Sequence, residues 1–197
     1  QTMLEKDKYL EKINYLIFLV IILFSQGLIA ETLKLKIIKY NNDLKNSSAL
    51  FLQNDGDSLE EGIIYFGIDR IKIDYTKPIK LTLILSEKKG IYTNHELRES
   101  QYFNTNKSYI KVFFKILKGD NFLDKPKMLE NFVELNHDFS LNNNIYKIKI
   151  IYEYDPIKLR KIIILENNQK IEMGFYNHNN LETYEKKFFS MINPYLD

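Results

Sequence analysis

The stretch between Leu50 and Leu85 limits the possible folds of this chain more than any other part. It contains short segments in which β-branched and aromatic residues recur at every second position, with Gly, Asp or Pro between the segments. Four strands are expected, at residues 49–54, 62–68, 70–76 and 80–86. Consecutive short strands joined by turns of this kind are typical of an antiparallel meander.

The alternation predicts one apolar face and one polar face for this meander. Ile71, Ile73 and Tyr75 share one face of the third strand, and Leu81 and Leu83 share one face of the fourth. Two interpretations of the apolar face remain open: it packs as an ordinary β core, or it lines a cavity for an apolar ligand. Periodicity does not separate them, and a one-residue slip would exchange the two faces of any strand.

The rest of the chain adds helices and further strands. Apolar side chains follow one helical stripe in residues 31–44, and residues 106–119 and 126–135 have similar helical spacing. Further strands are expected at residues 91–93, 97–103, 138–141, 145–154, 159–166, 170–176 and 187–190. We therefore expect a single domain over residues 31–197 that is mainly β with α: an incompletely closed, strongly curved antiparallel half-barrel covered by about three helices.

Residues 1–30 have the pattern of a secretory signal peptide. Lys6, Lys8 and Lys12 precede an uncharged apolar stretch at residues 13–30, which ends at the small residue Ala30. The stretch is near the lower length limit for spanning a bilayer. We expect cleavage after Ala30 and export from the cytoplasm, and retention of the segment as an N-terminal anchor is the alternative.

Several short motifs resemble those of the periplasmic lipoprotein carriers of the LolA family. Members commonly have an F-x-Q motif, an E-G pair, a strand leading to a tight turn, and an aromatic residue shortly before a proline. The corresponding residues here are Phe51-Leu52-Gln53, Glu61-Gly62, the turn near Gly67, Tyr75-Thr76-Lys77-Pro78, and Phe188-Phe189 before Pro194. The expected helix at residues 31–44 matches the first helix of the family, so the similarity covers most of residues 31–197.

The resemblance implies a periplasmic chaperone that binds the acyl chains of lipoproteins in a hydrophobic cavity and carries them from the inner to the outer membrane. Its implied partners are acylated lipoproteins, an inner-membrane lipoprotein-releasing ABC transporter and, if present, an outer-membrane acceptor. Three of the expected cavity residues would belong to a helical lid, namely Phe113, Phe114 and Met128. The others are Leu50, Leu52, Ile64, Phe66, Ile71, Ile73, Leu81 and Leu83.

One position departs from the family pattern. Counting back from Pro78 without gaps, the turn arginine that helps govern the family's lid falls on Gly67, and the turn proline falls on Ile68. Arg70 lies three residues further along and is the candidate gating residue. The alternative is that gating works differently in this chain.

Composition and motifs argue against several other functions. The net charge of +2 is too small to indicate nucleic-acid binding, and the absence of cysteine excludes disulfides and thiolate chemistry. The sequence has no G-x-S-x-G, H-E-x-x-H or Gly-rich phosphate motif, so we expect no enzymatic activity, cofactor or metal. His95, His137 and His178 are far apart in the sequence and are expected in solvated loops.

A non-carrying interaction domain on the same half-barrel is the main alternative function. Such a domain would sense envelope lipids or bind a regulatory partner, and fold alone does not distinguish it from a carrier. An uncleaved anchor would favour it, because a shuttle must diffuse freely.

Overall fold

The computed structural model describes residues 31–107, 110, 111, 114, 126–141, 144–167, 169–180 and 183–196. The predicted signal peptide, the lid residue Phe113 and most of the helix expected at residues 106–119 lie outside these ranges. Residues 110, 111 and 114, within that expected helix, are helical.

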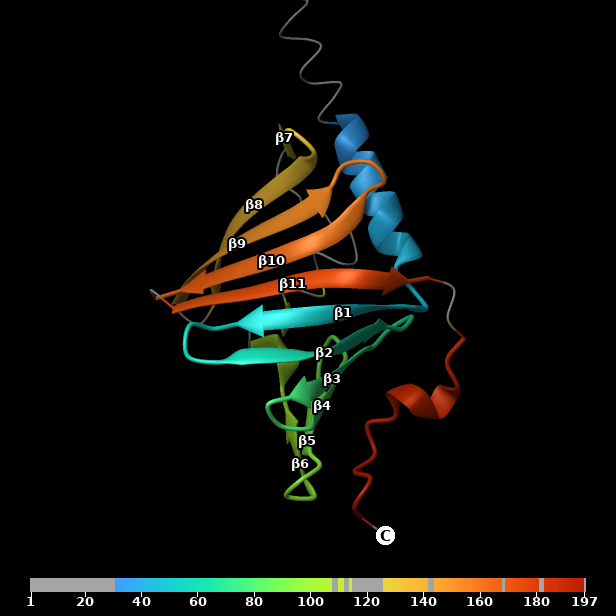
Figure 1. Ribbon diagram of the computed structural model, residues 1–197. Coiled ribbons are helices and arrows are strands. Elements are labelled where there is room, and N and C mark those ends of the chain that lie inside the picture. The colour runs from blue at the N-terminus through green and yellow to red at the C-terminus, as the bar shows by residue number, and fades with distance from the viewer. Residues whose placement is uncertain are drawn as a thin grey trace, which may run out of the picture.

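Eleven antiparallel strands form one sheet in the order β6-β5-β4-β3-β2-β1-β11-β10-β9-β8-β7 (Figure 1). Their bounds are β1 Ser47–Asn54, β2 Leu59–Phe66, β3 Ile71–Lys77, β4 Leu81–Leu85, β5 Gly90–Asn94, β6 Glu99–Phe103, β7 Lys127–Leu129, β8 Phe132–Leu141, β9 Asn144–Glu153, β10 Lys158–Glu166 and β11 Gln169–Asn179. The end strands β6 and β7 do not pair with each other, so the sheet stays open. This confirms the predicted half-barrel architecture.

The predicted meander is present with small shifts at the strand ends. Ile71, Ile73 and Tyr75 of β3 pair with Leu85, Leu83 and Leu81 of β4, which puts the apolar residues of both strands on one face. The two halves of the sheet join where β1 pairs with β11. Residues more than a hundred positions apart in the sequence therefore share one apolar face, called the concave face below.

Residues 31–43 form the predicted N-terminal helix, which lies beside β9 and β10 (Figure 1). Leu33 and Ile37 bury the apolar stripe of the helix in the core. Two hydrogen bonds fix the orientation of the helix on the sheet. The Tyr152 hydroxyl donates to Asn41 Oδ1 at 3.2 Å, and the Leu159 N–H donates to the Tyr40 hydroxyl at 3.0 Å. Burial raises the pKa of Tyr152, which keeps its hydroxyl protonated as a donor.

The helix predicted at residues 126–135 is wrong, because these residues form the β7–β8 hairpin. Leu129 pairs with Phe132, and Glu130 takes a positive φ of 52° in the two-residue turn between them. Met128, expected in a helical lid, is a strand residue whose side chain is 41% exposed. No helix in the described ranges has both the length and the apolar character needed to cross a membrane.

The strand predicted at residues 187–190 is also wrong. The chain there forms a short 3₁₀ helix, η2 (Lys186–Phe189), inside a mostly irregular C-terminal segment. Residues 183–196, called the strap below, run beside β2–β6 (Figure 1). Met191 of the strap packs with Ile84 and Ile91 on the outer face of the sheet, and the Tyr102 hydroxyl donates to the Met191 carbonyl at 2.9 Å.

Candidate functional site

The apolar core lies on the concave face, where both halves of the sheet contribute side chains. Ile64, Phe66, Ile71 and Ile73 come from the first half, and all four are buried in the same cluster as Val133, Leu135, Ile148 and Ile150 from the second. Leu83 packs against this cluster, and Leu81 shares its face through its pairing with Tyr75. The predicted face of β2, β3 and β4 is therefore the inward one.

The predicted face of β1 is wrong by one residue. Phe51 is fully buried on the concave face, whereas its neighbours Leu50 and Leu52 point to the outer face, and Leu52 is 41% exposed. Neither leucine lines the apolar cavity on the concave face.

A small apolar cavity of about 80 Å³ lies on the concave face. Predicted residues Ile73 and Leu83 line it, and so does the helical residue Ile110. The remaining lining residues are Gln53, Tyr75, Leu85, Ile162, Ile164, Ile171 and Met173. Ligand pockets usually measure about 300–1,000 Å³, so the cavity in this structure has room for only a short piece of an acyl chain.

One end of this cavity is polar. The Tyr75 hydroxyl donates to Gln53 Oε1 at 3.3 Å, and Gln53 Nε2 donates to Glu60 Oε2 at 2.8 Å. Burial raises the pKa of Glu60, and the nearby Asp55 carboxylate raises it further. These hydrogen bonds pair the half-buried amide of Gln53, so the apolar surface of the cavity ends there.

Arg70, the predicted gating residue, contacts the strap. Its Nη1 donates to the Phe189 carbonyl at 2.6 Å. Next to it, the Gly67 N–H donates to the Arg70 carbonyl at 2.8 Å, and a Cβ added to Gly67 would lie 3.0 Å from the Phe189 ring. Arg70 therefore connects the β2–β3 turn to the strap by a hydrogen bond. Gating by Arg70 stays a prediction.

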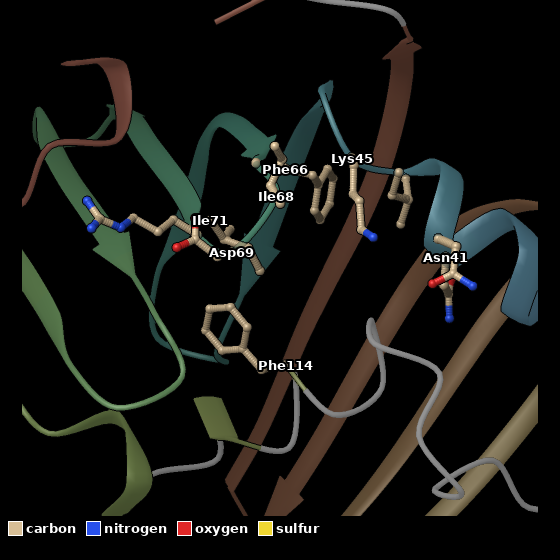
Figure 2. A pocket seen from close by; sticks show the side chains of 11 residues that line it. Asn41, Lys45, Phe66, Ile68, Asp69, Ile71 and Phe114 are labelled. Atoms are coloured by element: carbon tan, nitrogen blue, oxygen red, sulfur yellow. The ribbon is translucent and has the colours of Figure 1, made fainter. Parts of the chain in front are cut away.

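A second and larger pocket, called the mouth pocket below, lies beyond the end of the N-terminal helix (Figure 2). Its volume is about 310 Å³. The β2–β3 turn forms one side, and Phe114, predicted as a lid residue, forms part of the apolar wall. Its lining residues are Asn41, Asn42, Leu44, Lys45, Phe66, Gly67, Ile68, Asp69, Arg70, Ile71 and Phe114.

Two of the three histidines lie in strands, which corrects the expectation of loop positions. His137 is on β8, with its ring 6.5 Å from that of Phe139, and His178 is on β11, where its Nε2 donates to the Leu159 carbonyl at 2.8 Å. Burial lowers the pKa of His178. The exposed His95 bonds Tyr195 and Thr82. Among the described residues, no group of three or more His, Cys, Asp or Glu is arranged to hold a metal ion.

Comparison with known proteins finds similarity at the level of fold. No family model and no curated protein matches the sequence. An uncharacterized conserved protein from Thermus thermophilus has a similar structure, with a TM-score of 0.54 and 8% identity over 82% of this chain and 93% of that one. This similarity shows a shared fold and does not assign a function.

Two other solved structures align less closely. The Pseudomonas aeruginosa MucA/MucB complex matches with a TM-score of 0.45 and 8% identity, over 82% of this chain and 60% of that one. LprF from Mycobacterium bovis matches with a TM-score of 0.42 and 10% identity, over 78% of this chain and 94% of that one.

Proposed function

We propose that this protein is a LolA-like periplasmic carrier that shelters the acyl chains of lipoproteins on its concave face. The observation that supports this most directly is the apolar cavity between the two halves of an open sheet, where Ile73 and Leu83 face Ile162 and Ile164. The sequence motifs described above point to the same class of protein. The inner-membrane transporter and the outer-membrane acceptor are proposed as partners on those motifs alone.

Burial of the acyl chain would provide the affinity. Each buried methylene contributes about 0.8 kcal/mol, so a chain of roughly sixteen carbons contributes on the order of 13 kcal/mol before the costs of binding. The cavity of about 80 Å³ is too small for such a chain. Binding therefore requires a more open state, and the balance between closed and open states would set how readily the lipid is released.

Native mass spectrometry tests this proposal. The protein is incubated with a triacylated lipoprotein in detergent, the detergent is removed, and the soluble complex is weighed. We expect a one-to-one complex, which Leu83→Glu should abolish by placing a charge in the cavity wall. Leu52→Glu is the matched control, because it makes the same change on the outer face and should leave the complex intact.

Circular dichroism and thermal melting of both variants establish that they fold. The absence of any complex with the unaltered protein would contradict the proposal. A folded Leu83→Glu protein that binds lipoprotein as well as the unaltered protein would contradict it as well.

The small cavity volume favours one alternative, an interaction domain that carries no lipid. Such a domain would sense envelope lipids or bind a regulatory partner through its surface. Retention of the full chain in the membrane fraction, together with the absence of a lipoprotein complex, would support this alternative over the carrier.

A further inference from the structure

The mouth pocket is separate from the cavity proposed for lipoprotein acyl chains. Its lining residues come from the end of the N-terminal helix, the β2–β3 turn and Phe114, whereas the cavity is lined mainly by β3, β4, β10 and β11. At about 310 Å³ it reaches the size range of small-molecule sites, about 300–1,000 Å³.

One wall of the mouth pocket is apolar. Phe66, Ile71 and Phe114 are all buried and belong to the main core cluster, yet each has a surface that faces the pocket (Figure 2). Ile68 and Leu44 extend this apolar surface. An alkyl chain in contact with these side chains would be removed from water.

Polar residues adjoin this wall, and Lys45 and Arg70 are the cationic side chains among the lining residues. The side chain of Lys45 extends into the pocket between Phe66 and Asn41 (Figure 2). Within the described part of the chain, the side chain of Lys45 makes no hydrogen bond or ion pair. By contrast, Arg70 on the pocket rim already donates to the Phe189 carbonyl at 2.6 Å.

The backbone around Lys45 is fixed by local hydrogen bonds. The Ser47 hydroxyl donates to the Leu44 carbonyl at 2.5 Å, and the Asn46 N–H donates to the Phe66 carbonyl at 2.7 Å. Asn46 has a positive φ of 62°, a conformation that asparagine tolerates better than most residues. The turn therefore holds Lys45 at the end of β2, beside the apolar wall.

The local charges favour an anion at Lys45. The C-terminal end of a helix carries about half a negative charge, which opposes an anion, but the lysine ammonium carries a full positive charge. Asp69, the acidic residue on the rim, and Lys45 are both exposed, so water and salt weaken the repulsion by Asp69 and the attraction by Lys45 alike. With Arg70, the pocket lining has two cationic side chains and one acidic one. An anionic group beside Lys45 would thus meet a cation that has no other partner among the described residues.

We propose that the mouth pocket binds an anionic amphiphile with one acyl chain, placing its carboxylate or phosphate at Lys45 and its chain against Phe66, Ile71 and Phe114. Free fatty acids and monoacyl phospholipids both have this chemistry. If a methylene needs about as much room as a water molecule, about 30 Å³, the pocket volume accommodates about ten carbons. The proposal goes beyond lipoprotein carriage and does not depend on it.

Isothermal titration calorimetry of the full chain with decanoate tests the site. We expect decanoate to bind, and monodecanoylglycerol, which has a similar chain and no charge, to bind about threefold more weakly or worse. Lys45→Gln should lower the affinity for decanoate about threefold, the size expected for losing an ion pair at an exposed lysine, and should not change the affinity for monodecanoylglycerol. Lys88→Gln, at an exposed turn lysine, is the matched control and should change neither of these two affinities.

A parallel titration with monodecanoyl phosphatidic acid shows whether a carboxylate or a phosphate head group binds more tightly.

Equal affinities for decanoate and monodecanoylglycerol would overturn the proposal, as would unchanged decanoate binding by Lys45→Gln. Leu83→Glu separates this site from the concave cavity, since it should leave decanoate binding unchanged while abolishing the lipoprotein complex. A protein that forms the lipoprotein complex but does not bind decanoate refutes the mouth-pocket proposal alone.

Discussion

At the scale of single residues, Gly62 of β2 lies directly against the backbone of β3. A Cβ added there would overlap the Asp74 carbonyl oxygen and lie 2.8 Å from the Phe51 ring. The pairing register of the two strands shifts at this point, between Glu61 and Gly62. The glycine that resembles part of an E-G motif in the sequence is thus required by backbone packing.

Gly62→Ala should therefore destabilise the protein by roughly 2 kcal/mol or more, because neither the carbonyl nor the buried ring can move away without disturbing the core. Chemical denaturation measures the change. Gly174→Ala is the matched control on β11, since its added Cβ would lie no closer than 3.9 Å to another atom, and it should change stability by about 0.5 kcal/mol or less. Equal effects of the two substitutions would contradict this account of Gly62.

His178 predicts a pH dependence of stability. Burial lowers the pKa of His178 in the folded protein below its ordinary value of 6.5. As the pH falls below about 6.5, the unfolded chain therefore binds more protons at this residue than the folded protein does. The contribution of His178 to the free energy of unfolding should therefore be fully present above that pH. It should decrease below that pH until His178 is protonated in the folded protein as well. Melting temperatures between pH 7.5 and 5 should decline, and His178→Gln should reduce the decline, because glutamine can still donate to the Leu159 carbonyl but does not titrate. An unchanged decline in that variant would exclude His178 as its cause.

Which residues face the core could be predicted only where polar residues mark the other face. In β3, Lys72 and Asp74 separate Ile71, Ile73 and Tyr75, and the inward face was predicted correctly. In β1, the four residues from Ala49 to Leu52 are all apolar, so a period of two does not decide between Phe51 and its neighbours. The pairing of β1 with β11, more than a hundred residues away, makes Phe51 the inward residue.

At the scale of elements, the sequence could predict most strands but not the β7–β8 hairpin. Met128, Leu129, Phe132 and Val133 satisfy helical spacing, and a proline precedes them. The same spacing also fits two strands joined by a two-residue turn, in which Leu129 and Phe132 pair. Pairing of β8 with ten residues of β9 favours the strand, an interaction that local sequence does not reveal.

The strap predicts a contrast between two adjacent side chains. Met191 is 8% exposed against Ile84 and Ile91, whereas Ile192 is 76% exposed. Met191→Asp should detach the strap, because a bound strap would bury a carboxylate without a partner, and the lost contacts should lower stability by about 1–3 kcal/mol. Hydrogen exchange should accelerate in residues 183–196 of that variant and stay unchanged in Ile192→Asp. Slow exchange in Met191→Asp would show that the outer-face contacts do not hold the strap.

At the scale of the whole molecule, the open sheet could be predicted from the sequence, whereas its cavities could not. Alternating strands and turns are local features, but the concave cavity exists because Ile73 and Leu83 face Ile162 and Met173 from the other half of the chain. The mouth pocket similarly needs the end of the helix, the β2–β3 turn and Phe114 to meet. A residue such as Lys45, in a short turn, has no sequence pattern that marks it as part of a site.

The cavity itself predicts an opposition between stability and lipid binding. Ile171 is half-buried and lines the free space of about 80 Å³, so Ile171→Phe should place its extra atoms there and leave stability unchanged or increased. If the ring removes room for two methylenes at about 0.8 kcal/mol each, affinity for an acylated lipoprotein should fall about tenfold. Native mass spectrometry across a lipoprotein titration measures the affinity, and thermal melting measures the stability. Leu165→Phe, on the outer face of β10, is the control and should change neither. Full lipoprotein affinity in a stable Ile171→Phe protein would mean that the space is a packing gap and that acyl chains bind elsewhere.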